Sequence, residues 1–210
     1  PANYGIDKAK GEYIGFLDGD DWCEPDAFGK LIRAADTYEA DVSFCNFMGY
    51  YEETEDFRYP PDKNRLRDLQ RTAHHKPDTQ ALKHNLIGML PVPWRKIYRR
   101  DFLNENNIRF PVGDYFFEDN PFHWFTTILA KKTVFIDTVG FYHTYGRQGQ
   151  SMSGDSGEKF LKFFMHGDTI KDFLKNNGLY KEYKYDLVNW YLNQSSWIIK
   201  RLDNHNKEIL

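Results

Sequence analysis

Three aspartates directly follow a short apolar run near the start of the chain. In GEYIGFLDGDDWCEPDAF, residues 11–28, Asp18, Asp20 and Asp21 come after residues that favour strands. Like charges so close together repel, and they are tolerable where water or a cation screens them. Carboxylates in an Asp-x-Asp arrangement suit Mg²⁺ or Mn²⁺ held jointly with substrate phosphates. The competing interpretation is an ordinary acidic turn, and for Asp21 we favour a turn or capping role.

Regular elements must position these side chains. The sequence predicts an initial helix, a strand over 13–17, a helix over 25–38 and a strand starting at Asp41. It then predicts a long loop over 52–77, a helix over 78–87, and a short strand with a helical turn in PWRKIYRRDFL. Asp119 or Asn120 would cap a helix with Pro121 at its first position. TVFID and GFYHTY are predicted as two further strands.

Beyond Gly157 the pattern becomes helical. Phe160, Phe163, Phe164, Gly167, Ile170 and Leu174 form one helical face, and Tyr183, Leu187, Trp190, Tyr191, Gln194, Trp197 and Ile198 form another. The sequence therefore predicts an α/β domain over residues 1–155 and a helical C-terminal extension over 156–210. The lysines beside the phenylalanine face leave a peripheral membrane contact open, but we favour packing on the domain or on a second copy.

Composition excludes several protein classes. The 28 basic and 31 acidic residues give a net charge of −3, which argues against a nucleic-acid partner. The two cysteines, Cys23 and Cys45, have no metal-site spacing, so we expect reduced, buried thiols rather than a disulfide. No apolar run approaches membrane-spanning length.

Four segments resemble the family 2 glycosyltransferases, the inverting nucleotide-sugar enzymes of the GT-A fold. GEYIGFLDGDDWCEPDAF resembles the family's central Leu-Asp-x-Asp-Asp segment in order and spacing. PWRKIYRRDFL resembles its Trp-x-Lys-x-Tyr-Arg segment, IRFPVGDYFFEDNPF its acceptor-side Glu-Asp motif, and FIDTVGFYHTYGRQGQSMS its closing strand pair. The resemblance covers about residues 1–155.

The resemblance implies a role for each candidate residue. Asp20 would hold Mn²⁺ or Mg²⁺ against the nucleotide diphosphate, and Asp18 would face the ribose or the water shell of the metal. His143 would approach the metal or the diphosphate, and Arg147 would clamp the diphosphate. The alternatives are a hydrogen-bonded strand histidine and a solvated loop arginine.

The acceptor side is implied in the same way. Asp119, with Glu118 beside it, would be the general base that deprotonates the acceptor hydroxyl. An ordinary helix cap is the competing role for Asp119, and both can hold. Trp94 could stack on an acceptor sugar, although a buried tryptophan is the alternative we favour.

Two departures from the family pattern matter. Ala2 stands where the family usually has an arginine, and the family's nucleotide-binding first strands have no counterpart in these 210 residues. We therefore expect a truncated GT-A-like mixed sheet flanked by helices. Such a sheet would have an unpaired edge beside the strand at 13–17, which favours self-association. Asp18 and Asp20 should end that strand at one cleft, with Trp22 buried beneath it.

The resulting hypothesis is a metal-dependent glycosyltransferase. It would transfer a sugar, with inversion, from a nucleotide-diphosphate sugar to a glycan or lipid-linked acceptor. The setting would be cell-surface polysaccharide synthesis, in the cytoplasm or at the inner face of the membrane. The rival hypotheses are a noncatalytic binding or assembly module and, ranked lower, a metal-dependent phosphohydrolase.

Overall fold

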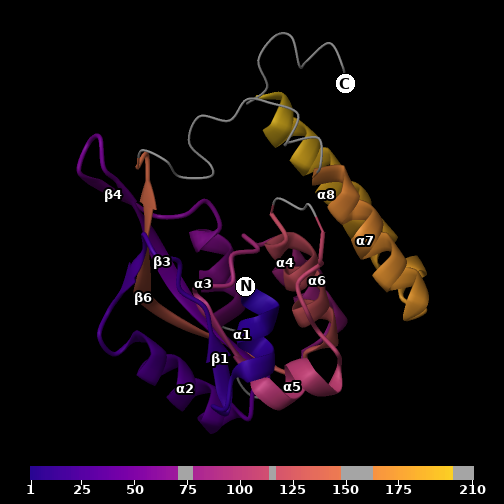
Figure 1. Cartoon of the computed structure of the whole chain (residues 1–210). Coiled ribbons are helices and arrows are strands. Elements are labelled where there is room, and N and C mark those ends of the chain that lie inside the picture. Colours follow the sequence, from indigo (N-terminus) through magenta and orange to yellow (C-terminus); the bar gives the residue numbers. More distant parts are fainter. Residues whose placement is uncertain (71–77, 114–116, 148–162, 201–210) are drawn as a thin grey trace.

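A mixed β-sheet forms the centre of the molecule (Figure 1). The computed structural model describes residues 1–70, 78–113, 117–147 and 163–200. Within them the strands follow the order β1-β5-β3-β6-β2, and β4 pairs with β3. Their bounds are β1 Tyr13–Gly15, β2 Trp22–Cys23, β3 Val42–Tyr51, β4 Asp56–Arg58, β5 Lys96–Arg99 and β6 Thr133–Tyr145. β3 and β6 are parallel and the other pairs are antiparallel, which confirms the predicted mixed sheet.

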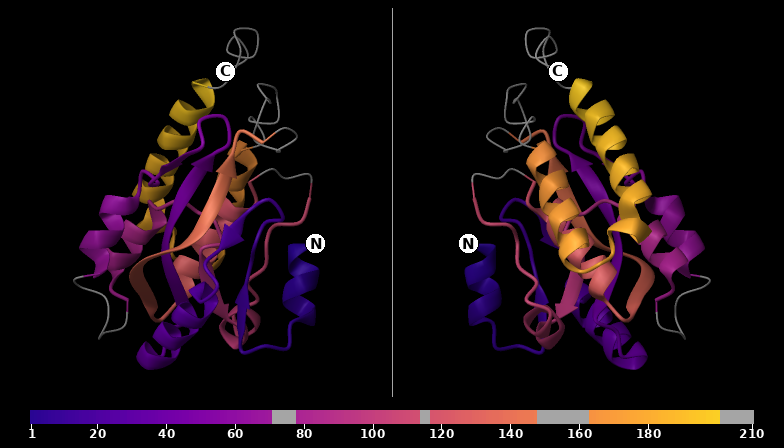
Figure 2. Two further views of the ribbon diagram at one scale, coloured as in Figure 1. Left: turned by 90° about the vertical axis from the view of Figure 1, so that its left-hand side faces the viewer. Right: turned by 90° about the vertical axis from the view of Figure 1, so that its right-hand side faces the viewer.

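Helices flank the sheet and extend away from it (Figure 2). Their bounds are α1 Ala2–Lys8, α2 Ala27–Tyr38, α3 Lys63–Gln70, α4 Gln80–Ile87, α5 Arg100–Glu105, α6 Asp119–Leu129, α7 Phe163–Asn176 and α8 Tyr180–Ile199. α2, predicted from its apolar spacing, packs Leu31 and Ala35 against Phe47 and Phe141 of the sheet. A separate core, which includes Phe44 and Phe135 of the sheet, contains Leu66 of α3 and Leu86 of α4.

The pair β3 and β6 carries most of the sheet. The register runs from Val42 opposite Thr133 to Tyr51 opposite Tyr145, with a shift around Asn46. The prediction of two strands in TVFID and GFYHTY was wrong, because β6 is one continuous strand. The register shift passes over Asp137 and Thr138, and Asn46 Nδ2 donates to Asp137 Oδ1 at 2.9 Å.

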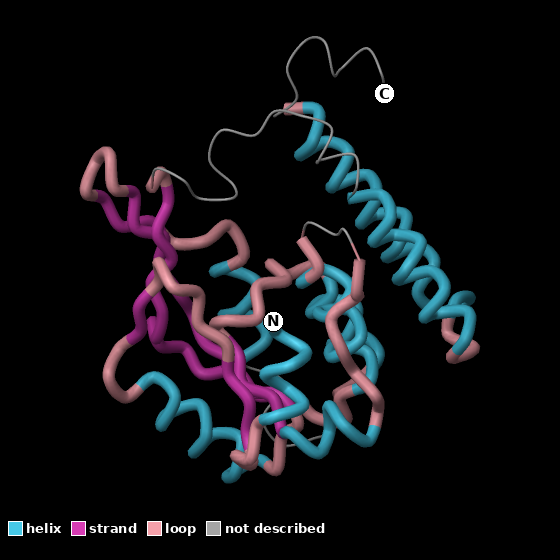
Figure 3. The backbone as a smooth tube through the Cα atoms, in the orientation of Figure 1, coloured by secondary structure: helices cyan, strands magenta, loops and turns pink. Residues whose placement is uncertain are grey.

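The C-terminal helices form an antiparallel pair beside α6 (Figure 3). Their core joins Trp124 and Ile128 of α6 to Ile170 of α7 and Trp190 of α8. The predicted helical faces are thus confirmed where they fall on α7 and α8, whereas Phe160 lies outside the described residues. The division at residues 155 and 156 stays a prediction.

Three boundaries differ from the predicted ones. The segment 52–77, predicted as a loop, contains β4 and α3, which is anchored by the fully buried Leu66. β1 ends at Gly15 instead of Leu17, and β1 lies at one end of the strand order. α6 begins at Asp119 with Glu118 as its N-cap, so Pro121 is its third residue. Short strands held by pairing with a neighbouring strand, and short helices held by one buried side chain, have too few residues to show a periodic apolar pattern in the sequence.

Two compositional expectations can be compared with the structure. Cys23 and Cys45 are free thiols, as expected, and burial raises the pKa of Cys45 to about 12. In the part of the chain that the structure describes, the helices are too short or too polar to cross a bilayer.

Candidate active site

Acidic side chains from two distant segments share one region. Asp18 lies in the loop after β1, where its pKa is raised by partial burial and then by the carboxylates of Asp21 and Asp20. Glu118, at the start of α6, also raises the pKa of Asp18, while His143 of β6 lowers it. The fold therefore brings both predicted acidic motifs and His143 within electrostatic reach of one another. Asp18 and Asp20 follow the strand in a loop instead of ending it.

Asp21 is the residue that ties this loop to β6. Its side chain is 1% exposed, and His143 Nδ1 lies 2.9 Å from Oδ1 and 2.8 Å from Oδ2. The backbone N–H of Thr144 donates to Asp21 Oδ1 at 3.0 Å, and the Thr144 hydroxyl donates to the carbonyl of Asp20 at 2.6 Å. The turn role favoured from the sequence misses this function, because the pairing depends on the register of β2 against β6.

The imidazole of His143 is also held by aromatic rings. Trp94 stacks on it with centroids 5.2 Å apart, and Tyr145 meets it edge-on at 4.6 Å. Trp94 is 3% exposed and packs edge-on against Phe47. This burial matches the buried tryptophan favoured from the sequence over stacking on an acceptor sugar, and the contacts assign the ring to orienting His143.

The expectation that Trp22 is buried was wrong. Its side chain is 39% exposed and stacks on Tyr142 at 5.2 Å with nearly parallel rings. Tyr50 contacts Trp22 edge-on, and Phe57 does the same to Tyr142. Pairing of β2 with the outer part of β6 turns the indole onto the sheet surface instead of beneath the carboxylates.

The chemistry of the donor set decides which metal it could hold. The described ranges contain no group of three or more His, Cys, Asp or Glu side chains positioned as a metal cage. Asp18 and Asp20 are the candidate oxygen ligands, and because Asp21 engages only Nδ1 of His143, Nε2 of that ring stays a candidate nitrogen ligand. One or two carboxylates completed by substrate phosphates are a typical Mg²⁺ arrangement, so these residues fit such an ion.

Asp119 begins α6 in a largely desolvated position. Burial and then the neighbouring Glu118 raise its pKa to about 6, while Lys96 acts in the opposite direction. Asn120 Nδ2 donates to Asp119 Oδ1 at 3.1 Å. A carboxyl with a pKa close to neutrality can accept a proton and later release it, which suits a general base.

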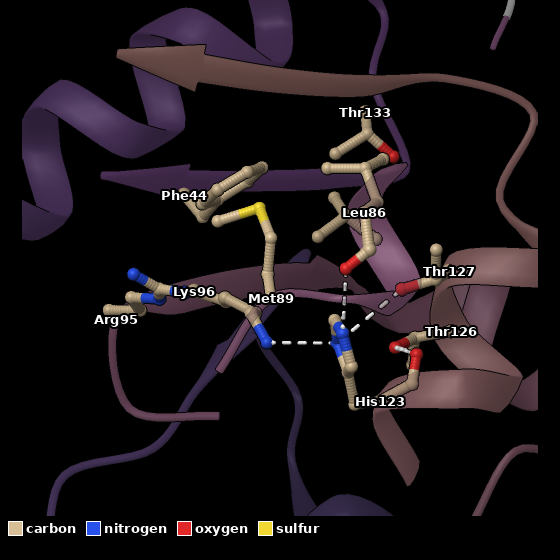
Figure 4. A pocket seen from close by; sticks show the side chains of 10 residues that line it. Phe44, Leu86, Met89, Arg95, Lys96, His123, Thr126, Thr127 and Thr133 are labelled. Carbon is tan, nitrogen blue, oxygen red and sulfur yellow. Dashed lines mark hydrogen bonds between the residues drawn. The ribbon is translucent and has the colours of Figure 1, made fainter. Parts of the chain in front are cut away.

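A buried lysine, Lys96, acts electrostatically on Asp119. Figure 4 shows its side chain directed at His123. Lys96 Nζ donates to the Pro91 carbonyl at 3.2 Å and lies 3.2 Å from His123 Nδ1. His123 Nε2 lies 3.0 Å from the Leu86 carbonyl, which can only accept, so Nε2 carries the proton and Nδ1 accepts from Lys96. Lys96 and His123 both line a cavity of about 20 Å³.

The strand β5 explains why Lys96 and Tyr98 both act on Asp119. Two residues apart in a strand, they point to the same face. Both are buried, and both interact electrostatically with Asp119. Neither was identified from the sequence as a site residue. The spacing of Lys96 and Tyr98, two residues apart within PWRKIYRR, could have indicated that both lie on the same face of a strand.

Arg147 lies at the end of β6, after Gly146, whose φ of 86° requires a left-handed backbone. Its side chain is about half exposed, with Nε 3.8 Å from Glu52 Oε1. The residues that follow, 148–162, are not described. The clamp role of Arg147 therefore stays a prediction.

Comparison with known proteins shows the family of the chain. The model for glycosyl transferase family 2 matches residues 2–106, half of the chain. The putative glycosyltransferase EpsH of Bacillus subtilis is 26% identical to this chain. The match covers 92% of this chain and 55% of EpsH. Poly(ribitol-phosphate) β-N-acetylglucosaminyltransferase TarS of Staphylococcus aureus is also 26% identical to this chain. That match covers 73% of this chain and 24% of TarS.

Solved structures show the same fold. The crystal structure of S. aureus TarS superposes with a TM-score of 0.61 at 20% identity, covering 91% of this chain and 30% of TarS. TarS 1–349 in complex with UDP-GlcNAc gives a TM-score of 0.54, covering 80% of this chain and 45% of that one. The chain thus spans about half the length of EpsH and less of TarS. With half of its residues matched by the family model, the chain belongs to glycosyl transferase family 2.

Proposed function

We propose that the whole protein transfers a sugar from a UDP-sugar to a hydroxyl of a cell-surface glycan or polyol polymer, with inversion. The observation that carries this proposal is that Glu118 raises the pKa of Asp18, so the carboxylate loop lies within electrostatic reach of the segment that bears Asp119. The name of TarS and its complex with UDP-GlcNAc support the donor and acceptor classes.

Asp119 acts as the general base in this proposal. Its carboxylate accepts the proton of the acceptor hydroxyl while the acceptor oxygen attacks the anomeric carbon and the bond to the diphosphate breaks. Because a single displacement forms one bond as it breaks the other, the anomeric configuration inverts. Asn120, bonded to Asp119 Oδ1, fixes the carboxylate for this role.

Asp18 and Asp20 would hold Mn²⁺ or Mg²⁺ together with the donor diphosphate. The cation supplies charge neutralisation for the leaving UDP when bound. Asp21 and Trp94 keep the His143 ring at this end of the site, where it can meet the diphosphate. Arg147 would add a second cation from the end of β6. We place the reaction in the cytoplasm or at the inner face of the membrane, as the resemblance implies.

The test uses the full-length protein with Mn²⁺ and UDP-GlcNAc or UDP-glucose. We expect release of UDP that depends on an added glycan or polyol acceptor. Asp119→Asn should abolish this release while leaving UDP binding, measured by calorimetry, largely intact. The matched control is Asp101→Asn, an exposed carboxylate in the first turn of α5.

The rival functions give different outcomes. A phosphohydrolase would release inorganic phosphate without an acceptor. A noncatalytic module would show neither release nor coupling between the binding of Mn²⁺ and of UDP. Normal turnover by Asp119→Asn would remove Asp119 from the mechanism.

A further inference from the structure

A cavity of about 560 Å³ lies between the domain and α8. α3, α4 and α6 contribute one side and α8 the other. This volume is typical of small-molecule sites, about 300–1,000 Å³. Asn120, whose amide donates to Asp119, is one of the lining residues.

The face that α8 presents to the cavity is unusual for a covering helix. Asp186, Asn189, Trp190, Asn193 and Gln194 all line it. Their spacing of three, four, seven and eight residues places them on one side of the helix. The apolar stripe by which α8 packs, Tyr183, Leu187, Trp190 and Ile198, shares only Trp190 with this lining. The rest of the lining on α8 carries amides, a carboxylate and the exposed Leu192. Asn189 and Asn193 remain exposed.

The remaining lining combines apolar and polar groups. Ile87, Met89 and Trp124 supply apolar surface. The two carboxylates of the lining are already engaged: Asp186 Oδ2 lies 2.8 Å from His84 Nδ1, and Asp62 pairs at 2.6 Å with Arg95, which is outside the lining. Arg65 Nη1 donates to the Gly88 carbonyl at 2.9 Å. The aromatic and apolar surface together with the neutral amides of α8 suits an uncharged ligand rich in hydroxyl groups.

A hydrogen-bond chain links this cavity to the general base. Trp190 Nε1 donates to Asn120 Oδ1 at 3.1 Å, and the amide of Asn120 donates to Asp119 at 3.1 Å. The indole fixes which end of the Asn120 amide faces Asp119. Trp190 is 7% exposed and belongs to the core that joins α8 to α6. A ligand at Trp190 would therefore lie two hydrogen bonds from the base.

We propose that this cavity binds a neutral sugar unit of the acceptor, with Asn189 and Asn193 holding its hydroxyl groups and Trp190 linking its presence to Asp119. The inference rests on the proposed function and deepens it, because it assigns the acceptor side of the reaction to α8. It also gives the C-terminal helices a role in substrate binding.

The test follows the indole N–H of Trp190 by NMR in the ¹⁵N-labelled chain. Its signal is assigned by its loss in Trp190→Phe, and methyl β-glucoside, N-acetylglucosamine and inorganic phosphate are added separately. We expect a saturable shift with at least one sugar and none with phosphate. The double variant Asn189→Ala with Asn193→Ala should weaken sugar binding at least fivefold. Asn85→Ala, an exposed amide of α4 outside the cavity, should leave it unchanged.

Three results would overturn the inference. They are no shift with either sugar up to its solubility limit, unchanged binding by the double variant, or a saturable shift with phosphate. Because no nucleotide is present, the outcome is independent of the donor reaction. Sugar binding without transfer by the full-length protein would contradict the proposed function alone, and transfer without sugar binding here would contradict this inference alone.

Discussion

Both carboxylate oxygens of Asp21 lie within 2.9 Å of Nδ1 of His143. A carboxylate only accepts hydrogen bonds, so Nδ1 carries a proton and, in the neutral ring, Nε2 is the free acceptor. Trp94 covers one face of the same ring. The loop after β1 thus fixes both the tautomer and the orientation of a side chain on β6.

Asp21→Asn should disturb that tautomer. The asparagine can still accept from the Thr144 N–H, but its amide nitrogen would donate to His143 Nδ1 and move the ring proton to Nε2. The ¹⁵N shifts of the His143 ring should report Nδ1–H in the wild type and Nε2–H in the variant. Thr144→Val, which removes only the hydroxyl bond to the Asp20 carbonyl, is the control. The same tautomer in Asp21→Asn and wild type would contradict the assignment.

Asp119→Asn should make the fold more stable at alkaline pH. The folded-state pKa of Asp119 is raised to about 6, so the folded chain holds this proton more tightly than the unfolded chain does. Ionisation therefore costs stability as the pH rises from about 4 to about 6, and the cost persists above that. The variant avoids this loss of stability. Its free energy of unfolding should exceed that of the wild type by no more than about 3 kcal/mol at pH 8 and by less than about 1 kcal/mol at pH 4.

Urea unfolding at the two pH values measures this difference. Asp101→Asn, at an exposed carboxylate, should show no comparable dependence on pH. If Asp119→Asn changed the free energy of unfolding equally at both pH values, ionisation of Asp119 would not destabilise the fold. The same ionisation predicts that transfer by the full-length protein falls as the pH drops below about 6.

The sequence predicted long periodic elements well and lateral pairings poorly. The spacing of Leu31 and Ala35 was sufficient for α2, because burial of one apolar face dominates a helix of this length. Trp22 was misplaced because its exposure depends on which strand β2 pairs with, and no local pattern encodes that partner. The contact of Asp21 with His143 spans 122 residues and follows from the same pairing.

The buried pair Asp62 and Arg95 should be a major determinant of stability. Arg95 is fully buried, with Nη2 2.6 Å from Asp62 Oδ2, and Asp62 also accepts from the Leu90 N–H. Asp62→Ala would leave a buried guanidinium without its partner and should cost about 3–5 kcal/mol of unfolding free energy. Asp26→Ala, which breaks the exposed pair with Lys30, should leave the unfolding midpoint nearly unchanged. Equal midpoints for the two variants would contradict this ranking.

Lys96 should control the ionisation of Asp119. It is buried on β5, held by His123 and the Pro91 carbonyl, and burial followed by the charge of Arg95 lowers its own pKa well below the usual range. In its charged form Lys96 lowers the pKa of Asp119 against the opposing effects of burial and Glu118. Among the described residues, Arg95 and Asp62 also act on Lys96, while Asn120 acts on Asp119. Lys96→Met removes the cation and keeps much of the side-chain volume. It should raise the pKa of Asp119 by about 1 unit or more.

The Asp119 carboxyl can be followed by ¹³C NMR, with its signal assigned by its absence in Asp119→Asn. Lys83→Met is the matched control, because Lys83 is also partly buried and donates to a carbonyl, that of Ile128, but faces Asp78 and Glu182 instead of Asp119. If Lys96 were only structural, Lys96→Met would lower stability, as Lys83→Met would, and the pH midpoint of the Asp119 titration would stay the same in both variants. A midpoint that rises in Lys96→Met alone would identify Lys96 as the residue that sets the proton affinity of the base.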